Sequence, residues 1–296
     1  MLDLLAVSVV WAFSFGIIKH ELPNLAPAAV GVVRLVLAAA VLLPAWRPRA
    51  LPRTGALWLV AVGALQFGVM YVLYLRAFAY LQAYEIALAT ILTPVYVVLL
   101  DSAIDNRFRP RHVLAAVMAV LGAGVLVWRR ASSEGDAIMV GFLLMQLSNL
   151  CFAAGQVAYR RTRPGLPPGM TDAAVFAWLY LGGIAVTAAV SSFGTDWGGF
   201  HPTDRQMLWL LVLGTVASGL GFYGWNLGAT RVNAGTLAVF NNAKVPLGVA
   251  ASLLCFGEKA NLTRLGLSFA LLGAAVWVAG RARPVPPDPA PADQPA

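Results

Sequence analysis

Ten apolar runs, each about as long as a helix that crosses a bilayer, take up nearly the whole chain. A membrane-spanning helix needs roughly 20 mostly apolar residues, and its backbone satisfies its own hydrogen bonds where water is absent. We therefore expect an all-α membrane protein with ten transmembrane helices. The runs cover residues 3–19, 27–46, 55–79, 83–101, 112–128, 138–158, 173–193, 206–228, 233–255 and 263–280.

The composition agrees with a chain surrounded by lipid. Of 296 residues, 59% are hydrophobic and 11% are charged, and the mean hydropathy is +0.74. A net charge of +8 is compatible with nucleic-acid binding, but the basic residues lie in short stretches between the apolar runs. This distribution is typical of membrane topology. The expected surroundings are a lipid bilayer, and no nucleic-acid partner is expected.

The basic residues between the runs also predict an orientation. Of 21 Lys and Arg residues, twelve fall on the side of the two termini, six on the opposite side and three within the runs. Cytoplasmic loops carry the excess of positive charge. Both termini are therefore predicted to be cytoplasmic.

A shift of about 152 residues lays the first half of the chain on the second and places Pro94 on Pro246. Five runs per half is an odd number, so the second copy would enter the membrane with the opposite polarity. This 5+5 inverted repeat is typical of secondary transporters, whose substrate site lies near the midplane between the repeats. The expected units are residues 1–130 and 136–281, and the Pro-rich residues 282–296 are predicted to be a disordered cytoplasmic tail.

Lys244 lies near the middle of the ninth run, three residues after Asn241 and two after Asn242. A buried ammonium there costs roughly 2.5–3.5 kcal/mol even on an insertion scale, so a polar or anionic group must compensate. One interpretation is that Lys244 neutralises an internal carboxylate or bonds to carbonyls freed by Pro246. The other is that it faces a cavity and binds an anionic ligand. The second is favoured because no other run carries Asp or Glu at that depth.

Three further charged residues are candidates for gating or coupling. Arg34 lies near the middle of the second run, where a structural and a functional role are both open. Arg76 and Glu85 flank the turn between the third and fourth runs, which favours an ion pair. The alternative is that Glu85 is a gate or a proton-coupling carboxylate, with protons as the coupling ion.

Amide and aromatic side chains at similar depth form the remaining candidate site. Any single one is most simply a hydrogen bond between helices, worth about 0.6 kcal/mol on average in membranes. Together they predict an apolar slot with a few amide donors and acceptors, which suits a small polar organic molecule. The candidate substrate-binding residues are Lys244, Asn241, Asn242, Asn226, Asn149, Trp11, Tyr74 and Gln66.

Motifs of other protein classes are missing or misplaced. The two cysteines lie inside apolar runs, so neither a metal site nor a disulfide framework is predicted. Gly219, Gly221 and Gly224 match a dinucleotide-binding spacing, but they lie inside the eighth run with no strand before them. No protease, ATPase or serine hydrolase motif occurs. We therefore expect no enzyme, no cofactor and no metal.

Four short stretches carry a resemblance to a known family: Trp11-Ala12-Phe13-Ser14-Phe15-Gly16, Thr93-Pro94, Val245-Pro246 and Phe256-Gly257-Glu258. With the ten-run layout, they resemble the drug/metabolite transporter superfamily, EamA type, over residues 1–280. The first half departs from the pattern, with Asp105-Asn106 where many members have Gly-Glu.

Three longer stretches, 146–161, 176–183 and 217–246, resemble the biotin-importing members of the carboxylate, amino acid and amine transporter group. The resemblance implies a secondary transporter of the bacterial inner membrane that imports biotin or a related small carboxylate by alternating access. The alternative within transport is an exporter of amino acids or other small metabolites. Biotin agrees with the candidate residues, because its ureido group suits asparagine amides and its carboxylate suits Lys244.

Overall fold

The computed structural model describes residues 2–47, 51–105, 114, 117, 118, 121, 136–232 and 234–280. Helices account for the regular structure of this part, and no strand occurs in it, so the all-α prediction is confirmed there. The fifth apolar run, 112–128, and the predicted tail, 282–296, lie outside the described residues apart from four positions of the run.

The helices follow the predicted runs closely. The α-helices are α1 (Leu2–Glu21), α2 (Pro27–Leu42), α3 (Arg53–Gly63), α4 (Met70–Ala77), α5 (Ala83–Ala89), α6 (Thr93–Ile104), α8 (Asp136–Thr162), α9 (Asp172–Gly194), α10 (Asp204–Val212), α11 (Gly221–Arg231), α12 (Ala234–Leu254) and α13 (Leu262–Gly280). Seven helical segments of the described residues are long and apolar enough to cross a membrane. Ten spans remain a prediction.

Local sequence sets several of the helix ends. Pro27 begins α2, where its missing N–H costs no helical hydrogen bond. Thr203 and Gln206 form a reciprocal capping box at the start of α10. After α12, Gly257 adopts a positive φ of 67°, and the backbone N–H of Glu258 donates to the carbonyl of Ser252.

Three of the membrane-length segments are irregular in the middle. The π-helical turn η3 (Ala64–Val69) joins α3 to α4, and η6 (Leu213–Leu220) joins α10 to α11. The 3-10 turn η4 (Thr90–Leu92) separates α5 from α6 immediately before Pro94. Such turns often mark functional positions in helices.

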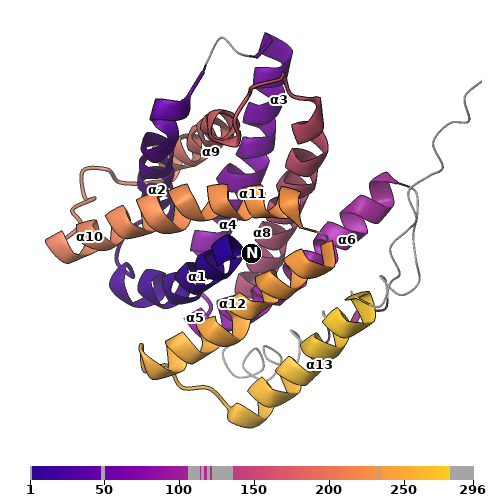
Figure 1. Cartoon of the computed structure of the whole chain (residues 1–296). Coiled ribbons are helices and arrows are strands. Elements are labelled where there is room, and N and C mark those ends of the chain that lie inside the picture. Colours follow the sequence, from indigo (N-terminus) through magenta and orange to yellow (C-terminus); the bar gives the residue numbers. More distant parts are fainter. Residues whose placement is uncertain are drawn as a thin grey trace, which may run out of the picture.

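Close backbone contacts hold α9 against α3. A Cβ at Gly63 would lie 1.9 Å from the carbonyl oxygen of Leu179, and one at Gly182 would lie 1.9 Å from that of Val60. In Figure 1, α2, α3 and α9 lie on one side of the bundle, and α12 and α13 lie on the other. The helices α1, α4, α8 and α11 lie between these two sides and surround the main cavity.

Candidate functional site

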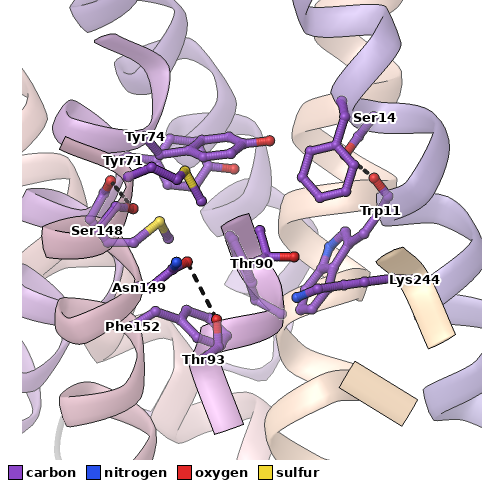
Figure 2. Close-up of a pocket in the computed structure, with 14 residues that line it drawn as sticks. Trp11, Ser14, Tyr71, Tyr74, Thr90, Thr93, Ser148, Asn149, Phe152 and Lys244 are labelled. Atoms are coloured by element: carbon purple, nitrogen blue, oxygen red, sulfur yellow. Dashed lines mark hydrogen bonds between the residues drawn. The ribbon is translucent and has the colours of Figure 1, made fainter. Parts of the chain in front are cut away.

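A cavity with about 520 Å³ of empty space, the open solvent at its mouth included, lies in the middle of the bundle. Aromatic and apolar side chains dominate its wall, and a few polar groups interrupt it (Figure 2). The lining residues are Trp11, Ser14, Phe15, Met70, Tyr71, Tyr74, Thr90, Thr93, Met145, Ser148, Asn149, Phe152, Phe222 and Lys244.

Lys244 is the cation of this wall and is 5% exposed. Its Nζ donates to Oδ1 of Asn241 at 2.8 Å. The same Nζ lies 5.1 Å from the ring centroid of Trp11 and 5.8 Å from that of Trp225, within cation–π range. Among the described residues, no carboxylate forms a salt bridge with Lys244. The interpretation that it neutralises an internal carboxylate is therefore wrong for this part of the chain.

The packing of α12 explains how Lys244 reaches the cavity. Asn241, Lys244 and Gly248 lie on one face of the helix, as their spacing predicts. Gly248 allows a close approach, since a Cβ there would lie 3.0 Å from atoms of both Ala87 and Phe15. Because the backbone of α12 comes this near to α1 and α5, the Lys244 side chain extends along the wall toward Trp11 (Figure 2).

Asn149, on α8, contributes to the wall opposite Lys244 in Figure 2. Its Nδ2 donates to the carbonyl of Ala89 at 2.9 Å, and its Oδ1 accepts from the hydroxyl of Thr93 at 3.3 Å. Thr93 and Ala89 flank the turn η4. The amide thus lines the cavity and also supports the break in the helix beside it.

The aromatic wall is anchored by polar contacts behind it. Nε1 of Trp11 donates to the carbonyl of Ala217 at 2.9 Å, which orients its ring against Phe222 at a centroid distance of 5.4 Å. The hydroxyl groups of Tyr71 and Ser218 are 2.6 Å apart. These partners leave the ring faces toward the cavity, where an apolar ligand can stack.

Two predicted site residues, Gln66 and Asn226, form hydrogen bonds with each other. Gln66 and Asn226 are 0% and 1% exposed, and neither lines the cavity. Nε2 of Gln66 donates to Oδ1 of Asn226 at 3.2 Å, and Nδ2 of Asn226 donates to Oε1 of Gln66 at 3.4 Å. The prediction that these two amides contact substrate directly is therefore corrected: they contact each other and join η3 to α11.

The other predicted residues fall into three groups. Trp11, Tyr74, Asn149 and Lys244 line the cavity as predicted. Asn241 lies behind Lys244 and is 2% exposed. The side chain of Asn242 lies outside those that the structure describes, although its backbone belongs to α12.

Arg34 lies behind the cavity wall. Its Nε and Nη2 donate to Oγ of Ser218 at 3.2 and 3.1 Å, and its guanidinium lies 5.0 Å from the Tyr71 ring centroid. Ser218 in turn donates to the carbonyl of Leu213, five residues earlier, inside the π-helical turn η6. Arg34 therefore stabilises this turn and the ring of Tyr71, and it does not line the cavity.

Arg76 and Glu85 differ in solvent exposure. Arg76 is exposed, and its ion pair with Glu85 stays a prediction. Glu85 is 2% exposed, and its Oε2 accepts from the backbone N–H of Gln82 at 2.8 Å. Its carboxylate thus belongs to the capping box of α5.

Sequence reasoning missed several wall residues that carried a usable signal. Tyr71 precedes the predicted Tyr74 by three residues, and Phe152 follows the predicted Asn149 by three, so each pair shares a helix face. Met145 and Phe222 precede the predicted Asn149 and Asn226 by four residues, which likewise places them on the same helix faces.

Comparisons with known proteins agree on one family. The sequence model of the EamA-like transporter family matches residues 1–128 and 139–279. A probable biotin transporter of Pseudomonas aeruginosa is 38% identical over 93% of this chain and 96% of that protein. Biotin transporters of Salmonella typhimurium and Escherichia coli K12 are each 37% identical, over 93% of this chain and 91% of each relative.

More distant similarities extend beyond these relatives. The aromatic amino acid exporter YddG of Ancylobacter novellus is 28% identical over 74% of each chain. One solved crystal structure has the same fold, with a TM-score of 0.66 and 22% identity over 95% of this chain and 98% of that one.

Proposed function

Because the chain belongs to the EamA-like transporter family, we propose that it takes up biotin or a closely related small carboxylate by alternating access. The family and the named relatives make it a multi-pass membrane transporter and not an enzyme. The substrate, the direction and the mechanism are the parts proposed.

The observation that carries the proposal is the position of Lys244 on a mainly apolar cavity wall. An ammonium has three donors, and one of them is used by Asn241. The two indole rings offset part of its desolvation without neutralising it. An anion that enters this cavity therefore meets a desolvated cation with donors to spare, so a substrate carboxylate would bind there strongly.

The rest of the wall suits the rest of biotin. The rings of Trp11, Phe152 and Phe222 lie together, and they would pack against an apolar bicycle. The hydroxyl group of Thr93 and the amide of Asn149 lie on the wall that Figure 2 shows across from Lys244, and Thr90 lies between them and Lys244. A ureido group, with paired donors and a carbonyl acceptor, would bind between them.

Alternating access through a 5+5 inverted repeat is supported by matched features of the two halves. The shift of 152 residues places Gln66, within η3, on Ser218, within η6. The packing contacts are matched too. The contact of α9 with η3 corresponds to that of α2 with η6, and α6 with α8 corresponds to α12 with α1. Two similar halves around one cavity would rock against each other about a fixed site.

Export of an amino acid is the second candidate, supported by the similarity to YddG. A zwitterionic amino acid needs a partner for its ammonium as well as for its carboxylate. Among the described residues, no acidic side chain lines the cavity, whereas Lys244 does. The wall therefore favours a substrate with a carboxylate and no cationic group.

Growth of a bacterial biotin auxotroph that lacks its own importer tests the proposal. Expression of this chain should restore growth on trace biotin and the uptake of radiolabelled biotin into cells. An exporter would restore neither and would instead lower the cellular content of its substrate. Expression of the chain is checked by immunoblot, so that absence of uptake despite expression would decide against import.

A further inference from the structure

Asn241 forms a bridge between Lys244 and the broken helix that contains Thr90. Its Oδ1 accepts from Nζ of Lys244 at 2.8 Å, and its Nδ2 donates to the carbonyl of Thr90 at 3.4 Å. The amide is 2% exposed and lies off the cavity wall. One side chain therefore contacts both the cation of the site and the backbone of another span.

The carbonyl of Thr90 is available because of Pro94. In a continuous helix this carbonyl would accept from the N–H of residue 94, which proline lacks. The chain passes instead through the 3-10 turn η4, in which the N–H of Thr93 donates to Thr90. Nδ2 of Asn241 supplies the further donor, as Nδ2 of Asn149 does for the carbonyl of Ala89.

The half-helix α5 is held at its other end as well. The carboxylate of Glu258 accepts from the backbone N–H groups of Ala83 and Tyr84 at 2.9 and 3.0 Å, and it lies 3.0 Å from Nε2 of His20. The seven residues of α5 thus lie between a capped end and the 3-10 turn η4. A change of bend at η4 would move this short segment as one body.

We propose that Asn241 is a positioning residue that couples occupation of Lys244 to the bend between α5 and α6. This inference rests on the proposed function, because it takes a carboxylate as the ligand of Lys244. The free donors of Lys244 bind the carboxylate, and the resulting ion pair draws Nζ away from Oδ1 of Asn241. The released amide then rotates, and its long contact with Thr90 is lost. The ligand thereby stabilises a different bend, because a ligand shifts a conformational equilibrium toward the state that it binds better.

The test compares binding and turnover in purified protein that is reconstituted in liposomes. Asn241→Leu removes both contacts at similar volume, and Gln156→Leu is the matched control at an equally buried amide that does not line the cavity. Asn241→Leu should lower biotin turnover about tenfold or more, while the Kd for radiolabelled biotin changes less than about threefold. Gln156→Leu should bind and transport like the unmodified chain.

A labelling experiment detects the movement itself. In a chain without native cysteines, Ala83→Cys reports whether the end of α5 leaves Glu258, since position 83 is 0% exposed. Biotin should change its alkylation rate, and Asn241→Leu should abolish that change. Biotin methyl ester, which has no carboxylate, should leave the rate unaltered.

Pro94→Ala keeps the inference testable if Asn241→Leu does not fold. Alanine supplies the missing N–H to Thr90, so the bend should be lost while the cavity keeps Lys244. Binding of biotin should persist, and turnover should fall about tenfold or more. Normal turnover in either variant would overturn the inference alone, as would equal losses of binding and turnover in Asn241→Leu. Absence of biotin binding by the unmodified chain would overturn the proposed function and the inference with it.

Discussion

Gln66 and Asn226 face each other in the bundle and exchange two hydrogen bonds, so that each amide is donor and acceptor to the other. Truncating one partner leaves the other buried and unsatisfied, at a cost of about 1–3 kcal/mol. Gln66→Leu and Asn226→Leu should therefore each lower thermal stability, and the double variant should lose less than their sum. The unfolding temperatures of the three variants are measured in detergent. Additive losses would show that the two amides do not interact.

Gly182 is a second position where a small change should have a large effect. A Cβ there would lie 1.9 Å from the carbonyl oxygen of Val60, and backbone cannot yield as a side chain can. Gly182→Ala should cost about 1–3 kcal/mol or more and should separate α9 from α3. Gly266→Ala is the control, because nothing lies within 4 Å of its Cβ position. Size-exclusion profiles before and after heating compare the two, and similar profiles would argue against this close crossing.

Glu258 stabilises the end of α5 from a distant part of the chain. Its side chain is 3% exposed and accepts two backbone hydrogen bonds. A hydrogen bond to a charged group contributes about 1.5–3 kcal/mol, so Glu258→Ala should clearly lower the unfolding temperature. Glu21→Ala removes an ion pair to Arg205, whose side chain is 72% exposed, and should lower the unfolding temperature far less, because solvent screens the pair. Equal losses for the two variants would contradict the capping role of Glu258.

The sequence predicted the all-α membrane character of the chain and pointed to Lys244, which lines the cavity, for physical reasons. Apolar runs were recognisable because lipid tolerates few polar residues over the thickness of a bilayer. Lys244 was recognisable because a charge within such a run has a high free-energy cost. In both cases one strong energetic constraint acts on a short local segment.

The partners of the polar residues could not be predicted in the same way. Gln66 and Asn149 are both amides inside apolar runs, yet one pairs with Asn226 and the other lines the cavity. Arg76 and Glu85 are close in sequence, but the carboxylate of Glu85 accepts a hydrogen bond from the backbone N–H of Gln82 in the capping box of α5. Such choices depend on which helix faces meet, and this depends on packing of the whole bundle.

The predicted orientation can be measured with reporter fusions. Because the basic residues favour the side of the termini, fusions after Arg163 and after Arg283 should both read cytoplasmic. A fusion between Phe193 and Asp204 should read periplasmic. A periplasmic signal after Arg163 would reverse the orientation.

Transport of biotin and of its methyl ester by Lys244→Met tests the central claim most directly. Methionine keeps the length and the apolar character of the side chain and removes the buried charge, so the protein should fold at least as well. Loss of the carboxylate's partner should raise the apparent Kd for biotin by roughly one to three decades. The uncharged ester should be affected far less. Equal losses for acid and ester, together with less folded protein, would contradict the assignment of Lys244 as the residue that binds the substrate carboxylate.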